Sequence, residues 1–141
     1  MHIQFEILDL KEIHRIIPLI QKLTEHKFSD AILNERFAEM ATQNYECAVI
    51  FDGDKLIGVT GIWYSTRHYV GKSAEIDHVF IEEAYRSQGI GKQFLSWIYS
   101  HVKSKGCEAA ELNTYVQNYP SHKFYYNEGF EILGYHFLKK L

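Results

Sequence analysis

The sequence contains little cysteine, little proline and no long apolar run, and each scarcity excludes a class of protein. Its two cysteines, Cys47 and Cys107, lie far apart, so neither a disulfide framework nor a cysteine-based zinc site is expected, and a reducing cytoplasm is the default location. With 2 prolines and 9 glycines, the chain does not resemble disordered or collagen-like proteins. No segment approaches about 18 consecutive apolar residues, and the N-terminus lacks a secretory-signal pattern, so no membrane association is expected.

A large charge imbalance is absent as well. The chain carries 15 Lys and Arg against 18 Asp and Glu, a formal net charge of −3, without a basic run. Nucleic-acid binding is therefore not expected, because it requires the neutralisation of many phosphates. The 8 histidines show neither H-x-x-x-H nor H-E-x-x-H spacing, so no metal site is expected.

The residues that are present suit one globular domain spanning residues 1–141. Hydrophobic residues make up 46% of the chain and aromatic residues 15%. A domain of this length buries enough surface to fold without disulfides or a structural metal.

Hydrophobic periodicity predicts an α/β (α+β) domain with the order β-α-α-β-β-β-α-β-α-β. The pattern indicates an antiparallel front half, with a hairpin turn at Asp52-Gly53-Asp54, and a β-α-β unit in the second half. Pro18 is expected to kink or split the first helix. Strands are predicted at residues 3–7, 46–51, 55–63, 71–81, 109–116 and 130–138, and helices at about 9–25, 29–42, 90–105 and 121–128.

Residues 86–92, RSQGIGK, stand between a predicted strand and the helix that follows it. Gly89 and Gly91 allow a tight turn and a close backbone approach, and the helix N-terminus presents unpaired N–H groups to an anion. Arg86 and Lys92 add positive charge. The segment matches neither the Walker pattern nor the dinucleotide fingerprint, and no carboxylate pattern for Mg²⁺ accompanies it. It predicts a pyrophosphate site for a metal-independent cofactor, the alternative being an ordinary glycine turn.

Two segments resemble the GNAT superfamily of acetyl-CoA-dependent N-acetyltransferases. Residues 74–92, AEIDHVFIEEAYRSQGIGK, are similar to its motif A, and residues 118–130, NYPSHKFYYNEGF, are similar to its N-x-x-A-x-x-F-Y-x-x-x-G-F segment, with Ser121 in place of Ala. The resemblance covers nearly the whole chain. It implies a mixed, mostly antiparallel sheet splayed at a cofactor cleft. It also implies transfer of an acetyl group from acetyl-CoA to a primary amine, without a metal.

The resemblance also implies roles for individual residues. Backbone groups in the strand before the loop would contact pantetheine, the loop would hold the pyrophosphate, and Asn118 would contact pantetheine through its side chain. Tyr125 matches the tyrosine beside the thioester sulfur and is the predicted general acid, with Tyr126 as the alternative if the helix register differs by one. The implied cofactor-binding residues are Val79, Phe80, Ile81, Arg86, Ser87, Gln88, Gly89, Ile90, Gly91, Lys92, Asn118 and Tyr125.

The general base stays open among three residues of one strand or a water chain. An alkyl ammonium with a pKa near 10.4 must lose a proton before it attacks. By resemblance, Glu75 occupies the position of the base in the histone-acetylating branch, and Asp77 and His78 occupy an acidic pair of small-amine branches. The order of preference is Asp77, Glu75, His78. Strand alternation predicts Glu75, Asp77, Val79 and Ile81 on one face, and Ile76, His78 and Phe80 on the other.

The acceptor is the least specified part of the prediction. The family shapes its acceptor site with the first two helices, the loop at residues 25–30 and the strands around residues 63–69. Glu25, Asp30 and Asp77 there would suit a small cationic amine, while peptide and protein amines stay open. The competing class is an acetyl-CoA-binding module without turnover, against which the presence of both Asn118 and Tyr125 argues. The expected state is a monomer or a homodimer.

Overall fold

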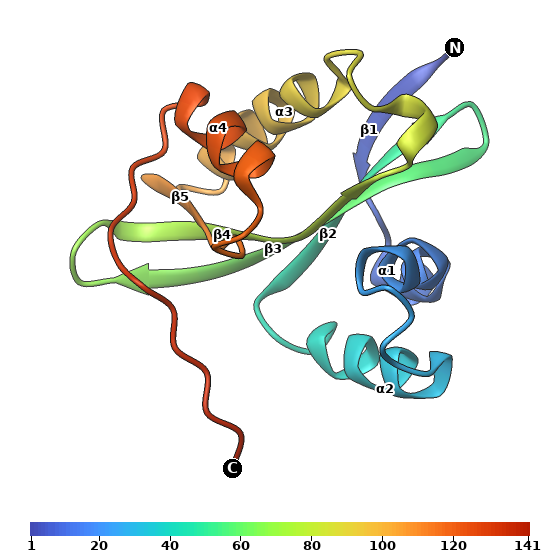
Figure 1. Cartoon of the computed structure of the whole chain (residues 1–141), viewed down its shortest axis with the longest axis horizontal. Helices are drawn as coiled ribbons and strands as arrows, with labels where there is room; N and C mark the ends of the chain where they lie inside the picture. Colours follow the sequence, from blue (N-terminus) through green and yellow to red (C-terminus); the bar gives the residue numbers. More distant parts are fainter.

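One five-stranded sheet organises the molecule (Figure 1), in a computed structural model that describes all 141 residues. The strands lie in the order β1-β2-β3-β4-β5, with antiparallel pairing throughout except between β4 and β5, which are parallel. The predicted mixed α/β fold with a mostly antiparallel sheet is therefore confirmed. The strands are β1 Ile3–Ile7, β2 Tyr45–Asp52, β3 Lys55–Arg67, β4 Gly71–Ile81 and β5 Ala109–Leu112.

Helices cover both faces of this sheet (Figure 1). Helices α1 (Ile17–Leu23) and α2 (Asp30–Met40) lie on one face, and α3 (Ile90–Ser104) and α4 (Tyr119–Asn127) on the other. Two short 3₁₀ helices, Leu10–Ile16 and Glu83–Tyr85, precede α1 and α3. The first predicted helix is split ahead of Pro18, which occupies the first turn of α1, as proline requires. None of the helices has both the length and the apolar character needed to cross a bilayer.

Each face of the sheet buries its own apolar core. Phe37 of α2 packs with Val49 and Val59 of the strands on the first face. Phe94 and Ile98 of α3 pack on the second face, and both side chains are almost completely inaccessible to solvent. The central strands are consequently apolar on both faces, so they form a rigid support for the polar strand ends described below.

A β-bulge in β4 reverses the predicted alternation of side chains. Asp77 pairs with Gly61 of β3, but the next pair joins Phe80 to Val59, so β4 has one extra residue over this stretch. His78, within the bulge, has a φ of 37°, in the left-handed region. Val79 and Ile81 therefore pack toward α3, whereas His78 and Phe80 join Glu75 and Asp77 on the face toward α2. The predicted placement of Val79, Ile81, His78 and Phe80 was wrong, because alternation assumes an unbroken ladder.

The last predicted strand, residues 130–138, is not formed. Residues 131–141 are exposed throughout and take part in no backbone hydrogen bond. A strand forms only where a neighbouring strand completes its backbone hydrogen bonds. In this molecule β5 pairs with β4 alone, so no strand pairs with residues 130–138. The fold therefore has the predicted order of elements up to α4 and ends in an extended arm (Figure 1).

Candidate active site

The sheet opens between β4 and β5. The parallel pairing joins residues 73–76 of β4 to residues 109–112 of β5 and then stops. From Asp77 to Ile81, β4 therefore has no strand partner on its β5 side. A free strand edge offers N–H and C=O groups to an extended ligand in the way a neighbouring strand would. The stretch coincides with the predicted pantetheine contacts at Val79, Phe80 and Ile81.

A row of free backbone N–H groups follows at the end of β4. None of the six N–H groups of residues 87–92 donates to a backbone carbonyl of the chain. Positive φ angles at Ser87 (61°) and Gly89 (79°) turn the backbone just before α3 begins at Ile90. These free donors and the positive end of the helix dipole form a site suited to a phosphate or pyrophosphate.

Side chains of the loop hold it against the end of β4. The Arg86 Nε donates to the carbonyl of Ile81 at 2.7 Å, and its guanidinium lies 5.1 Å from the centre of the Phe80 ring. The Gln88 side-chain amide donates to the carbonyl of Ala84 at 3.0 Å. Arg86 thus fixes the relative positions of the free strand edge and the N–H row. It also carries the positive charge that the sequence predicts there.

Gly91 lies where β4, α3 and α4 converge. A Cβ added at this position would be 3.6 Å from Ile81 Cδ1 and 4.0 Å from Phe124 Cζ, both ordinary contacts. The fold itself therefore leaves room for a methyl group at Gly91.

Tyr125 and Asn118 lie at the two ends of α4. Tyr125 is half-buried, with its ring centre 5.8 Å from that of Phe130, and its hydroxyl has no hydrogen-bond partner in the chain. Burial raises the pKa of Tyr125, so the phenol is protonated at neutral pH. Asn118 immediately precedes α4 without capping it through its side chain, which leaves its amide free. Tyr126, the alternative acid, is 58% exposed.

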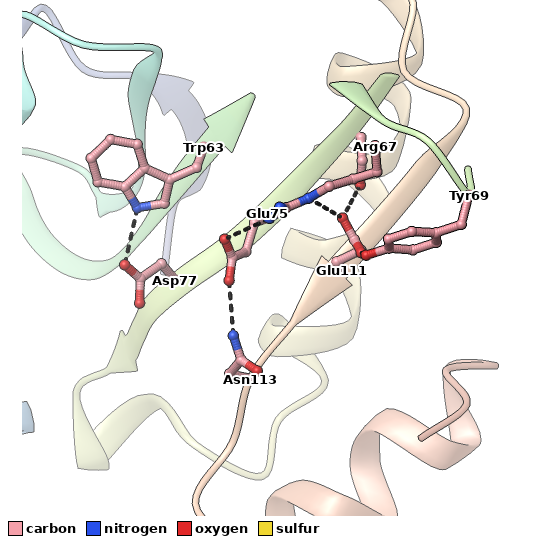
Figure 2. Close-up of polar contacts among 8 residues, drawn as sticks. Trp63, Arg67, Tyr69, Glu75, Asp77, Glu111 and Asn113 are labelled. Atoms are coloured by element: carbon pink, nitrogen blue, oxygen red, sulfur yellow. Dashed lines mark hydrogen bonds and ion pairs between the residues drawn. The ribbon is translucent and has the colours of Figure 1, made fainter. Parts of the chain in front are cut away.

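Polar side chains of three strands meet on the sheet face toward α2 (Figure 2). Asp77 accepts a hydrogen bond from the Trp63 indole N–H at 3.1 Å, and Glu75 accepts one from the Asn113 amide at 2.8 Å. The Arg67 guanidinium lies 4.0 Å from Glu75 and 3.7 Å from Glu111. We call this group of six residues the carboxylate face: Trp63, Arg67, Glu75, Asp77, Glu111 and Asn113.

An open cavity of about 370 Å³ adjoins the carboxylate face. Its lining includes the Glu75 carboxylate, the Arg67 guanidinium and the flat face of the Trp63 ring. This is the region predicted to shape the acceptor site. Asp30, one of the acidic residues predicted for the acceptor site, does not line this cavity: at the start of α2 it accepts a hydrogen bond from the Gln21 amide at 2.8 Å. The cavity is lined by Gln43, Asn44, Trp63, Tyr64, Ser65, Arg67 and Glu75.

His78 is enclosed by the bulge rather than directed at the cavity. Its Nε2 lies 2.7 Å from the Tyr45 hydroxyl, its ring packs edge-on against Phe37, and its Nδ1 is buried without a partner. A Cβ at Gly61 would lie 2.2 Å from Nε2, so only glycine fits opposite the imidazole. Burial lowers the pKa of His78 to about 4, which keeps the ring neutral near pH 7. These contacts favour a structural role for His78, in which it fixes the bulge. They argue against the role of general base, for which His78 was the third choice.

The enclosed imidazole predicts a loss of stability in acid. Because the pKa of His78 is lower in the folded protein than the ordinary 6.5, its contribution is complete above pH 6.5 and declines as the pH falls toward about 4. The free energy of unfolding should decrease there by at most about 1.4 kcal/mol per pH unit. Urea titrations at several pH values measure it, with His78→Gln as the matched variant. An equally steep decline in His78→Gln would assign the effect to other groups.

Several residues of the carboxylate face were not predicted from the sequence. Glu111 in β5 and Asn113 just after it have the same two-residue spacing as Glu75 and Asp77 in β4, which was the available signal. Their meeting depends on the parallel register, in which Glu75 lies opposite Glu111. No group of three or more His, Cys, Asp or Glu side chains has an arrangement that could hold a metal ion.

The residues that form β4, the N–H row and α4 lie within a stretch of sequence that matches a known family. Residues 10–130 match the model of the Acetyltransferase (GNAT) family. The chain belongs to this family. Membership of the GNAT family is what its two motifs implied.

Individual relatives agree with this assignment. The aminoalkylphosphonate N-acetyltransferase of Salmonella typhimurium is 31% identical over 74 residues, 52% of this chain and 48% of that protein, so the match spans about half of each. An aminoglycoside acetyltransferase from an uncultured soil metagenomic sample is 21% identical, with a TM-score of 0.82 over 99% of this chain and 96% of its own. AAC(6')-Iy, in complex with a CoA-containing bisubstrate analogue, is 16% identical, with a TM-score of 0.83 over 100% and 99%. At these identities, the two structures show the GNAT fold alone.

Proposed function

We propose that the protein transfers the acetyl group of acetyl-CoA to the primary amine of a small cationic molecule, by direct attack in a ternary complex. One observation carries the proposal: the free edge of β4 leads directly into the row of free N–H groups at residues 87–92. An extended chain that ends in a diphosphate fits these two features together. The carboxylate face lies along the earlier part of β4 and on the strands to either side of it (Figure 2).

The residues present fit acetyl-CoA. The N–H groups of residues 87–92 would hold the pyrophosphate, with Lys92 nearby, and Val79 and Ile81 would bind pantetheine through their backbone. The free amide of Asn118 would add a side-chain contact. Acetyl-CoA supplies the thioester that the amine attacks. An N–H of Val79 or Ile81 would also polarise the acetyl carbonyl.

Two protons have to move in this reaction, and we assign them to different groups. Tyr125 is protonated at neutral pH and its hydroxyl has no partner in the chain, so its proton is available for donation to the departing thiolate. Asp77 is the preferred base, directly or through water, because it is exposed and its hydrogen bonds come from neutral N–H groups. Glu75 is second, since it already accepts a hydrogen bond from the Asn113 amide and lies 4.0 Å from the Arg67 guanidinium.

The charges of the carboxylate face support a cationic acceptor. Glu75, Asp77 and Glu111 outnumber the single cation, Arg67, and the Trp63 ring offers a surface for an ammonium group. Arg67 also favours a second candidate, an amine with an anionic group at its other end. The name of the aminoalkylphosphonate relative is in keeping with that second acceptor.

A thiol-release assay tests the proposal. With acetyl-CoA held constant, a polyamine and an aminoglycoside should accelerate CoA release, and an aminoalkylphosphonate tests the second candidate. A peptide with a free N-terminus serves as the comparison. If acetyl-CoA binds tightly but no amine accelerates release, the chain is a binding module and the proposed transfer is wrong.

Asp77→Asn is expected to lower kcat/KM for the amine by about 10²-fold, because the amide cannot accept a proton. Asp54→Asn, an exposed change in the hairpin turn, is the matched control and should behave as wild type. Wild-type kcat/KM in Asp77→Asn, with the loss found instead in Glu75→Gln, would transfer the role to Glu75.

A further inference from the structure

The bulge in β4 decides which way the backbone N–H groups beyond it point. The N–H of Glu82 donates to the carbonyl of Ile57 in β3 at 2.8 Å, so this group points toward β3. Successive N–H groups of a strand point to opposite edges, so those of Val79 and Ile81 point to the free edge of β4. These are the two groups that the proposed function places against the cofactor.

Without the bulge, the same two N–H groups would face β3. Before the bulge, the carbonyl of Asp77 points toward β3, where it accepts a hydrogen bond from the Thr60 hydroxyl at 2.8 Å. In an unbroken strand, Val79 and Ile81 would follow Asp77 with the same orientation. The bulge at His78 shifts this alternation by one residue and turns both N–H groups to the free edge.

Side chains of β2 and β3 hold the bulge in place. Thr60 is fully buried, and its hydroxyl donates to the carbonyls of Asp77 and Gly61 at 2.8 and 3.2 Å. The Tyr45 hydroxyl lies 2.7 Å from the His78 Nε2, and the absence of a Cβ at Gly61 leaves room for the imidazole. The N–H of His78 donates to the Asp77 carboxylate at 2.8 Å. We call Tyr45, Thr60, Gly61 and His78 the bulge cluster.

The backbone at His78 depends on these contacts. Its φ of 37° lies in the left-handed region, which a residue with a Cβ seldom adopts. Such a conformation persists only where the surrounding structure determines it. The imidazole contacts the Tyr45 hydroxyl, and the adjoining carbonyl of Asp77 is held by Thr60. Loss of either contact should let the bulge relax and rotate the N–H of Val79.

We propose that Thr60 and the Tyr45–His78 pair are positioning residues, which hold the bulge and so direct the Val79 N–H at the acetyl carbonyl of acetyl-CoA. This role rests on the proposed function, which supplies the thioester. None of the three side chains has to touch the cofactor, since each acts through the backbone of β4. A fixed N–H donor stabilises the negative charge that develops on the carbonyl oxygen during attack. A displacement of about 1 Å can cost on the order of 10²-fold in rate.

Infrared difference spectroscopy of acetyl-CoA labelled with ¹³C at the acetyl carbonyl tests this role, with the cofactor bound and no amine present. A hydrogen bond from the Val79 N–H lowers the carbonyl stretching frequency below that of free acetyl-CoA. Thr60→Val keeps the shape of the side chain but removes the hydroxyl, so the frequency should return toward the free value. Its kcat should fall by about 10²-fold, with little change in KM for the amine. Thr60→Ser keeps the hydroxyl and should behave as wild type.

Tyr45→Phe tests the second contact independently of Thr60. It removes only the hydroxyl that contacts His78, and it should also raise the carbonyl frequency and lower kcat. Thr66→Val, the same substitution at an exposed position of β3, is the matched control and should keep the wild-type frequency. Circular dichroism and urea unfolding show which variants are folded, and the comparison uses those.

The carbonyl frequency separates positioning from a purely structural role. A folded Thr60→Val that loses turnover but keeps the wild-type frequency would overturn the proposal. Wild-type frequency and turnover in both Thr60→Val and Tyr45→Phe would overturn it as well, as would a wild-type frequency equal to that of free acetyl-CoA. A lowered frequency that depends on Thr60, in a protein that acetylates no amine, would support the positioning role and contradict the proposed transfer.

Discussion

Tyr125→Phe is expected to lower kcat by about 10²- to 10⁴-fold, the range that general acid catalysis contributes. The substitution removes only the hydroxyl, which has no partner in the chain, and keeps the ring that packs against Phe130. KM for acetyl-CoA should change little, because the phenol is proposed to act on the departing thiolate rather than in binding. Steady-state kinetics with saturating amine measure both quantities.

Tyr126→Phe is the control for this prediction. Tyr126 follows Tyr125 near the C-terminal end of α4. Its side chain is 58% exposed, so its hydroxyl should be dispensable for turnover. Wild-type turnover in Tyr125→Phe, with chemistry shown to be rate-limiting, would contradict the assignment. A loss in Tyr126→Phe alone would instead favour the alternative register of the helix.

Gly91→Asp is expected to weaken acetyl-CoA binding by roughly 10²-fold or more, because it places a carboxylate beside the proposed pyrophosphate site. The fold should tolerate the change, since a Cβ at Gly91 makes only ordinary contacts at 3.6 and 4.0 Å. A carboxylate in the first turn of α3 also interacts favourably with the helix dipole. Calorimetric titration with acetyl-CoA gives the dissociation constant, and urea unfolding gives the stability.

Two alanine variants separate charge from backbone effects. Gly91→Ala should change the free energy of unfolding by no more than about 1 kcal/mol and weaken binding much less than Gly91→Asp. Gly89→Ala should cost about 1–2 kcal/mol in stability, because the φ of Gly89 is 79° and disfavours a Cβ. Unimpaired binding in Gly91→Asp would show that the pyrophosphate does not lie at this turn.

Local chemistry was enough to predict most of the elements. Asp9 and Ser29 accept hydrogen bonds at the starts of their helices, Pro18 stands in the first turn of α1, and an Asp-Gly turn joins β2 to β3. These features depend on residues close in sequence, where capping and turn preferences operate. The family and the loop at residues 86–92 followed from motifs of the same local kind.

Features that depend on contacts between distant segments were predicted poorly. The bulge at His78 is fixed by Tyr45 and Phe37, which come from other elements, so strand alternation misplaced four side chains. The carboxylate face requires the parallel register of β4 and β5, which no local signal specifies. The strand predicted at residues 130–138 failed for the same reason, because a strand depends on pairing with a distant segment and these residues pair with none.

The central claim is that acetyl-CoA binds along the edge of β4 and over the N–H groups of residues 87–92. Titration of ¹⁵N-labelled protein with acetyl-CoA, followed by amide NMR, tests it directly. The account predicts the largest shifts and new exchange protection at the amides of residues 87–92, with further shifts at Val79 and Ile81. Saturable binding that leaves those amides unchanged, and shifts the residues of another surface instead, would contradict it.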